Sequence, residues 1–343
     1  VEFDKAVTYD SNYNVSIKVS EVSTDYTLKP IDSDHDNFAQ LDSKIKDANE
    51  NDVIDLENGV KLNEVNINEE TTYKNGIVID KSITIDGHGF TINATDASGN
   101  KVRIFNIANA DVTLKNMILT SGSVASPGGA AIYINGGSLT LINVTLIDNK
   151  VTALTGAALS ANNAQVTVVN SSFINNTLTK TDYSALGGGA AIYLNGGSLN
   201  VDNSLFEGNV YNGYSYSSAS VGGGGGAIYT TTATTNILNS RFIRNSAIRT
   251  GGSGELVAGA LLIKTGIIKG NIFEGNTATS APNTMRVTDA DAIVNYNAFV
   301  GTDAQTVGGS ANYQANWWGT NNPTSVGVTL TNWLVLSYSI DGK

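Results

Sequence analysis

After residue 100 the sequence repeats itself at intervals of 26 to 36 residues, and this repeat limits what the chain can fold into. Each copy has a large apolar residue at one position, and most copies have Asn three residues later. A fixed period of this size is typical of solenoids, in which each repeat packs only on its neighbours. The aligned apolar positions are Leu119, Leu146, Phe173, Phe206, Phe242, Phe273 and Phe299. The Asn positions are Asn149, Asn176, Asn209, Asn245 and Asn276.

Within one copy, apolar and polar residues alternate with a period of two, which indicates strands rather than helices. In the segment AAIYINGGSLTLINVTLI, Ile132 and Ile134 would face one side and Tyr133 the other. Three short strands joined by Asn and Gly turns cannot bury an apolar face alone, but stacked copies share one continuous core. The sequence therefore predicts an all-β parallel β-helix. Asn side chains should stack at its corners, at Asn116, Asn143, Asn170, Asn203 and Asn239.

Both ends of a solenoid need a cap, because an open end exposes unpaired backbone and core side chains. Near the N-terminus, Phe38, Leu41, Ile45 and Ala48 fall on one face of a helix, with Asp36 or Asn37 as its N-cap. The expected segments are a strand-like extension over 1–36, a helical cap over 37–60, the β-helix over 61–320 and a C-terminal cap strand over 321–343.

The net charge of −11 is placed unevenly along the chain. The first 100 residues hold 20 acidic and 8 basic side chains, whereas the rest of the chain holds 11 and 12. A nucleic-acid partner would need a basic stripe, which neither part offers. The longest apolar stretch, 258–268, is broken at Lys264 and is far shorter than the roughly 20 residues that span a bilayer. We therefore expect no nucleic-acid partner and no membrane insertion. The chain contains no cysteine, which excludes disulfides and thiolate metal sites.

Three kinds of segment together resemble a known family: the GGAIY repeats, the lead-in SITIDGHGFTI and the ending NWWGTNNP. They are similar to the right-handed parallel β-helix region of cell-surface adhesin-like proteins of methanogenic archaea, over residues 37–340. The GGAI repeats also resemble those of bacterial polymorphic outer-membrane proteins. The resemblance implies a pectin-lyase-like solenoid, an extracellular place at the cell surface or wall, and a role in attachment. It further implies a monomeric module of a longer surface protein.

An aromatic column is the first candidate for ligand binding. The alternation places Tyr133, Tyr193 and Tyr229 outward at equivalent repeat positions, with Ser160 and Leu262 in the same column. Tyr rings offer flat apolar area with a polar tip, which suits both sugars and protein loops. The alternative is a stacked column that only stabilises the solenoid.

The longer connections between repeats are the second candidate. They extend the period to 33 and 36 residues and carry Tyr183, Tyr211, Tyr214 and Tyr216 among Ser, Gly and Asn. Insertions in solenoids project from one face, which is often the binding face, and this composition is typical of antibody combining loops. The alternative is a flexible spacer.

Catalysis and metal binding are less well supported by the pattern. Carboxylates after residue 100 are scattered with respect to the repeat, whereas a glycoside hydrolase needs two in proximity. His88 lies between glycines at an expected corner, which favours a structural role. The spacing of Asp32, Asp34 and Asp36 is that of a calcium loop, but Asn37 stands where that loop needs Gly and Ser43 where it needs Glu. An acidic start to the helix is therefore the favoured explanation.

We therefore expect a non-enzymatic surface protein that attaches to glycans or proteins of another cell, with no catalytic residue, metal or cofactor. The alternative is a polysaccharide lyase or glycoside hydrolase on the same scaffold. Glycosylation sequons occur at Asn14, Asn93, Asn143, Asn170 and Asn175, although Asn143 and Asn170 also fit the corner stack.

Overall fold

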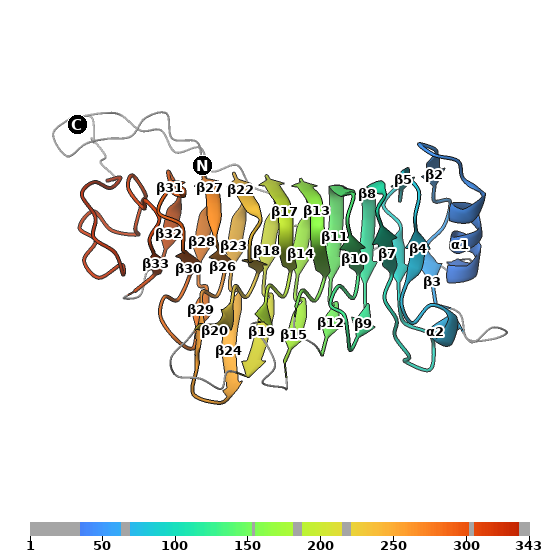
Figure 1. The fold of residues 1–343 in the computed structure, drawn as a ribbon, viewed down its shortest axis with the longest axis horizontal. Coiled ribbons are helices and arrows are strands. Elements are labelled where there is room, and N and C mark those ends of the chain that lie inside the picture. Colours follow the sequence, from blue (N-terminus) through green and yellow to red (C-terminus); the bar gives the residue numbers. More distant parts are fainter. Residues whose placement is uncertain are drawn as a thin grey trace, which may run out of the picture.

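The computed structural model describes residues 35–62, 69–152, 155–180, 187–214, 221–301 and 305–335. These residues form an all-β parallel solenoid of about 8 turns, seen from the side in Figure 1. Most strands belong to one 24-stranded sheet, and each turn adds three parallel strand segments to it. Three rows of strands therefore run along the rod, as the repeat predicts.

The first row contains β4 (Ile77–Ile79), β7 (Phe105–Ala108), β10 (Ile132–Asn135), the first parts of β13 (Leu159–Val169) and β17 (Ile192–Asp202), β21 (Ile228–Thr230), β26 (Leu261–Ile263), β30 (Met285–Val287) and β33 (Val307–Gly309). The second row contains β2 (Val53–Asp55), β5 (Ile83–Asp86), the first parts of β8 (Asp111–Thr120) and β11 (Ser138–Ile147), the later parts of β13 and β17, β22 (Thr234–Leu238), β27 (Thr265–Lys269) and β31 (Ile293–Asn295). The third row contains β1 (Asp36–Asn37), β3 (Val60–Lys61), β6 (Thr91–Asn93), the later parts of β8 and β11, β14 (Ser172–Ile174), β18 (Leu205–Glu207), β23 (Arg241–Ile243), β28 (Ile272–Glu274) and β32 (Ala298–Val300).

Two smaller sheets form from the connections that lead from the third row to the next first-row strand. The lateral sheet has six strands: β9 (Ser123–Val124), β12 (Lys150–Val151), β15 (Thr177–Thr179), β19 (Val210–Tyr214), β24 (Ser246–Gly251) and β29 (Thr277–Ala278). The glycine sheet has three: β16 (Gly187–Gly188), β20 (Val221–Gly224) and β25 (Glu255–Val257). In Figure 1 the lateral sheet runs along the lower side of the rod.

The repeated apolar position forms a single column in the core, as predicted from the sequence. Phe206 stacks on Phe242 with ring centroids 4.7 Å apart and planes 5° from parallel. The stack continues to Phe299, on which Trp318 closes the column with a centroid distance of 4.6 Å. Because every ring in the stack is buried, the column supplies continuous apolar contact from turn to turn.

The Asn residues that follow the apolar column form a buried amide ladder. The Asn209 side-chain oxygen accepts hydrogen bonds from the backbone N–H and the side-chain amide of Asn176, at 3.2 and 2.9 Å. The Asn209 amide in turn donates to the Asn245 side-chain oxygen and to the Phe173 carbonyl, both at 2.9 Å. The ladder thereby satisfies backbone groups that the turn between two strands would otherwise bury without partners.

A second, exposed set of Asn residues makes the corners between the second and third rows. Asn143 has a φ of 55°, in the left-handed region that Asn tolerates better than most residues. Its side-chain amide donates to the side-chain oxygen of Asn116, one turn earlier, at 3.0 Å. Asn203 bonds Asn170 in the same way at 2.7 Å. The predicted corner stack is therefore confirmed for these two pairs, whereas the Asn239 amide donates to the Asp202 carboxylate at 3.0 Å.

Helix α1 (Phe38–Asp47) covers the N-terminal end of the solenoid, where the sequence predicts a cap. Asn37 is its N-cap and forms a capping box with Gln40, and Phe38, Leu41 and Ile45 are buried against the first turns. A second, short helix, α2 (Glu69–Thr72), follows later. The predicted extension over 1–36 lies outside the described residues except for its last two positions.

The C-terminal end differs from the prediction. No strand occurs in 321–335, the described part of the expected cap strand. The segment instead packs irregularly, with Leu334 buried and the Trp333 indole N–H donating to the Asn321 carbonyl at 3.1 Å. Pro323 and Gly327, with a φ of 101°, interrupt the extended backbone that a strand needs.

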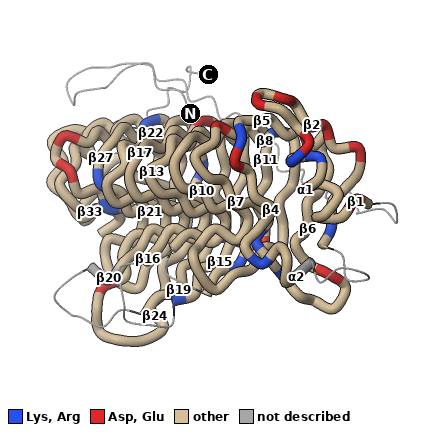
Figure 2. Tube along the Cα trace, turned by 45° about the vertical axis from the view of Figure 1, so that its right-hand side comes forward, with Lys and Arg blue, Asp and Glu red and all other residues tan. Residues whose placement is uncertain are grey.

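Charged residues gather at the α1 end of the rod and, in smaller number, at the opposite end near β27 and β33, whereas the middle turns carry few, as Figure 2 shows. None of the helices in the described ranges is long and apolar enough to cross a membrane.

Candidate ligand-binding groove

A groove of about 360 Å³ lies on the outer side of the first row, where β21, β26 and β30 pass beside β20 of the glycine sheet. Three successive turns of the solenoid contribute to it. Its lining consists of Gly223, Tyr229, Thr230, Thr231, Leu262, Ile263, Lys264, Arg286 and Thr288. An apolar floor, several hydroxyl groups and two cations therefore border one hollow.

The floor continues the predicted tyrosine column, whose register the structure confirms. Successive first-row strands align Tyr133, Ser160, Tyr193, Tyr229 and Leu262. Arg286 occupies the same column on β30, one turn further. The column thus changes along the rod from aromatic to aliphatic to cationic, and the change occurs inside the groove.

The tyrosines of the column are less accessible than an open aromatic face would be. Tyr229 is only 7% exposed, and the expectation that it faces solvent is wrong. The reason is that Val257 and Ala258, at the end of the glycine sheet, pack against Tyr229 and Leu262 as a small separate core. Tyr193 is partly buried and packs edge-on to Tyr229, with ring centroids 5.6 Å apart, but it is not part of the groove lining.

Burial also changes the ionisation of these phenols. It raises the pKa of Tyr229 to about 12, with a smaller contribution from Tyr193, and it raises the pKa of Tyr193 as well. A tyrosine hydroxyl is already neutral at physiological pH, and the raised pKa keeps both groups protonated, and thus able to donate hydrogen bonds, further into the alkaline range.

Tyr133 lies further along the column and is partly buried. The Arg103 guanidinium stands 5.2 Å from its ring centroid. Arg103 itself is held by backbone carbonyls, including those of Gly129 at 2.9 Å and Pro127 at 2.7 Å. Burial lowers the pKa of Arg103 to about 10. Tyr133 is therefore part of a structural contact rather than of the groove.

The wall of the groove requires glycine. The lining glycine is Gly223, which pairs with Gly187 in the glycine sheet, and a Cβ on Gly223 would lie 2.1 Å from the Gly187 carbonyl oxygen. The φ of Gly223, 135°, is also one that other residues rarely adopt. The groove wall at Gly223 is therefore bare backbone.

The two cations of the groove have no acidic partner. Within the described ranges, neither Lys264 nor Arg286 lies within 4 Å of a carboxylate. Lys264 is exposed and Arg286 is partly so. No residue of the groove lining is Asp or Glu. Neither positive charge of the groove is therefore held in an ion pair with a described residue.

The tyrosines expected on projecting loops have different positions. Tyr211 is fully buried in the core of the lateral sheet, and its expected exposure is a second error. It lies in register with Leu178 and Ala247, in a column of inward-facing residues. Tyr214 ends β19 and is partly exposed beside Gly251. Tyr183 and Tyr216 lie outside the described residues.

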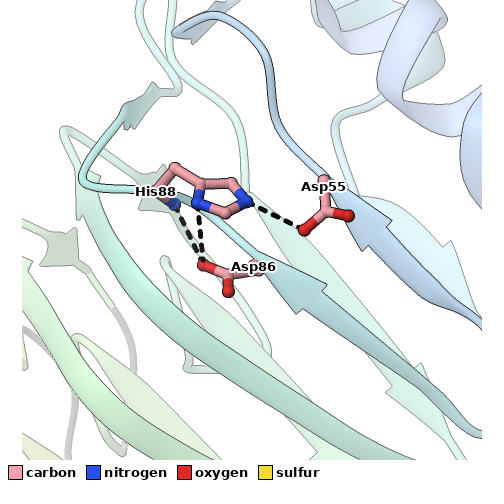
Figure 3. Close-up of side chains that lie close together, drawn as sticks. All are labelled: Asp55, Asp86 and His88. Atoms are coloured by element: carbon pink, nitrogen blue, oxygen red, sulfur yellow. Dashed lines mark hydrogen bonds and ion pairs between the residues drawn. The ribbon is translucent and has the colours of Figure 1, made fainter.

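A separate cluster of Asp55, Asp86 and His88 lies near the α1 end, drawn in Figure 3. The His88 ring nitrogen Nε2 is 2.8 Å from an Asp55 carboxylate oxygen, and the His88 backbone N–H donates to Asp86 at 3.1 Å. Asp55 and Asp86 come from adjacent strands, β2 and β5, and His88 follows at a corner with a φ of 47°. His88 does occupy a corner, as the sequence indicates.

The environment of Asp86 does not suit a metal ion or a general acid. The Lys115 ammonium is 3.0 Å from the Asp86 carboxylate oxygen Oδ2, so this carboxylate already has a cationic partner. Burial alone would raise the pKa of Asp86, but hydrogen bonds from Asn116 and His88, together with Lys115, outweigh it and lower the pKa to about 2. This carboxyl stays ionised and paired, so we assign the cluster a structural role.

The possible calcium loop is tested only in part. Asp32 and Asp34 lie outside the described residues, and Asp36 forms an ion pair with Lys44 at 3.0 Å.

Comparison of the chain with protein-family models, with curated proteins and with solved structures gives no match.

Sequence reasoning missed Lys264 and Arg286, and it misplaced Tyr211. The repeat carries signals for these residues. Arg286 continues the tyrosine column one turn beyond Leu262, and Lys264 follows Leu262 by two residues. Tyr211 stands five residues after the core residue Phe206, where other turns place Leu178 and Val151 after theirs.

Proposed function

We propose that this chain is a non-enzymatic attachment protein that binds surface glycans or proteins of another cell through the groove beside β20. The observation that carries the proposal is the composition of the groove. Tyr229 and Leu262 give it an apolar floor, and Thr231 and Thr288 add hydroxyl groups at its rim. A shallow site with an apolar base and a few polar groups suits a ligand held by flat contact and hydrogen bonds.

The resemblance of the repeats to adhesin-like surface proteins supports the same proposal and adds an extracellular location. In that setting, individual contacts would be weak, and many copies on one envelope would supply avidity.

A polysaccharide lyase or glycoside hydrolase remains the second candidate. Lys264 and Arg286 are residue types that a lyase uses to abstract a proton, which favours the lyase of the two. Against a hydrolase, the groove lining lacks the two carboxylates that such an enzyme needs. Sustained release of unsaturated ends or reducing ends from a polysaccharide panel would replace the attachment proposal.

The test is a binding screen on a printed glycan array and on intact cells, with variants that fill the groove. Thr288→Trp places a bulky ring at the exposed rim of the groove. Thr277→Trp is the matched control, because Thr277 is also exposed but belongs to the lateral sheet. We expect the wild type and Thr277→Trp to bind the same targets and Thr288→Trp to lose them. If nothing binds, or if both variants bind like the wild type, the proposal is wrong.

A further inference from the structure

We infer that the groove binds an acidic polysaccharide, whose carboxylate or sulfate groups are held by Lys264 and Arg286 while a sugar ring lies over Leu262 and Tyr229. This inference rests on the proposed function and specifies its ligand.

The two cations are placed for a ligand that follows the rod axis. Lys264 comes directly after β26 and Arg286 lies in the middle of β30, so they belong to adjacent turns. Adjacent parallel strands lie about 4.8 Å apart. Tyr229, one turn before Leu262, extends the apolar floor in the same direction. A polymer along the axis would thus meet an apolar patch first and positive charge next.

The negative net charge of the chain does not oppose this ligand. Six strand-to-strand steps, from β5 through β8, β11, β13, β17 and β22 to β27, separate the acidic end from the groove. At about 4.8 Å a step the separation is roughly 29 Å. The Debye length at physiological salt is about 8 Å, so that repulsion is screened at the groove.

A polysaccharide fits the groove better than an acidic peptide. Peptides that bind sheets usually add a strand to an open edge. Here β26 is paired on both sides, with β21 and with β30, and β30 is paired with β33. The floor therefore offers side chains rather than free backbone groups, and it matches a ligand whose own rings and charged substituents make the contacts.

One carboxylate near the groove has its own contacts. Asp289 follows Thr288, and its side-chain oxygen accepts a hydrogen bond from the backbone N–H of Asp291 at 3.0 Å. Its backbone N–H donates to the Lys264 carbonyl at 2.9 Å. Removing this negative charge should strengthen the binding of an anionic ligand.

The experiment measures affinities by calorimetry for alginate oligosaccharides, for carrageenan oligosaccharides, and for their carboxyl-reduced and desulfated counterparts. The alginate and carrageenan arms distinguish carboxylate from sulfate. The charge variant is Lys264→Gln with Arg286→Gln. The control is Lys101→Gln with Lys150→Gln, since both of these lysines are exposed and neither belongs to the groove lining. Polyglutamate of equal charge serves as the peptide arm.

We expect at least one acidic oligosaccharide to bind more tightly than its neutral counterpart, with an affinity that falls as salt rises. The groove variant should lose about tenfold or more, the control should lose little, and Asp289→Asn should gain. Equal affinity for acidic and neutral sugars overturns the inference, as does equal binding of polyglutamate. If neutral glycans bind and Thr288→Trp blocks them, the attachment proposal stands without this inference. If no glycan or cell binds, both fail.

Discussion

Replacement of Asn209 by Ala tests the view that the amide ladder holds the turns of the solenoid together. The side chain takes part in four hydrogen bonds, two with Asn176 and one each with Asn245 and the Phe173 carbonyl. All four are fully buried, and the residue itself is 0% exposed. Each such bond contributes about 1 kcal/mol to stability, and the Asn176 N–H that loses its acceptor adds a further cost. The four bonds account for about 4 kcal/mol, so the expected loss is at least about 4 kcal/mol.

Asn236→Ala is the matched control. Asn236 lies in β22 and makes one exposed side-chain bond, to Asn200 at 3.0 Å, so its removal should cost only about 0.5 kcal/mol. The measurement is urea unfolding followed by circular dichroism. Because solenoid stability is built from contacts between neighbouring turns, hydrogen exchange should also show the loss in the turns around residues 173–245. A difference below about 1 kcal/mol between the two variants would refute the reasoning.

Two further predictions concern residues outside the groove. The lowered pKa of Asp86 means that its contribution to stability is complete above about pH 4 and is lost as the pH falls toward 2. Asp86→Asn should therefore be less stable than the wild type at pH 7, and the gap in thermal midpoints should close in acid. A gap that stays constant would contradict this. Tyr211→Ala should lower the free energy of unfolding by about 3 to 5 kcal/mol, as measured by thermal unfolding, because the side chain is fully buried. The folded variant should keep its affinity in the glycan array. A specific loss of binding would show that Tyr211 contacts the ligand.

The core could be predicted from the sequence, because equivalent residues of successive repeats stack on one another in the core. Phe206 and Phe242 are 36 residues apart in sequence and still stack directly, and the same alignment identifies the ladder residues Asn209 and Asn245. Periodicity failed at the C-terminus, where the repeat fades. The Trp residues there indicate burial but do not specify the irregular path of 321–335.

The sequence predicted the column of residues on the groove floor but not the layer that covers part of it. The alternation correctly gave the register of Tyr193 and Tyr229, but it could not show that a second layer covers part of that face. The covering layer comes from connections rich in glycine, such as Gly223 and Gly224, whose sequence has no apolar alternation. A glycine-rich segment looks like a flexible spacer in the sequence, and only the structure shows that it pairs as a β-strand. The burial of Tyr211 was not predicted for a related reason. The residues around Tyr211 have the composition of a loop, whereas its position in the repeat is that of a buried residue.

The spacing between turns varies by up to ten residues, from 26 to 36, without disturbing the register of the three rows. The extra length lies between the lateral strands and the next first-row strand, beyond Leu178 in one turn and beyond Tyr211 in the next. The length of a connection can thus change from turn to turn without changing the packing of the core. Connections of different length therefore leave the stacked rings and amides in place from turn to turn. The rod can consequently serve as a frame on which the connecting sequence diversifies at little cost to folding.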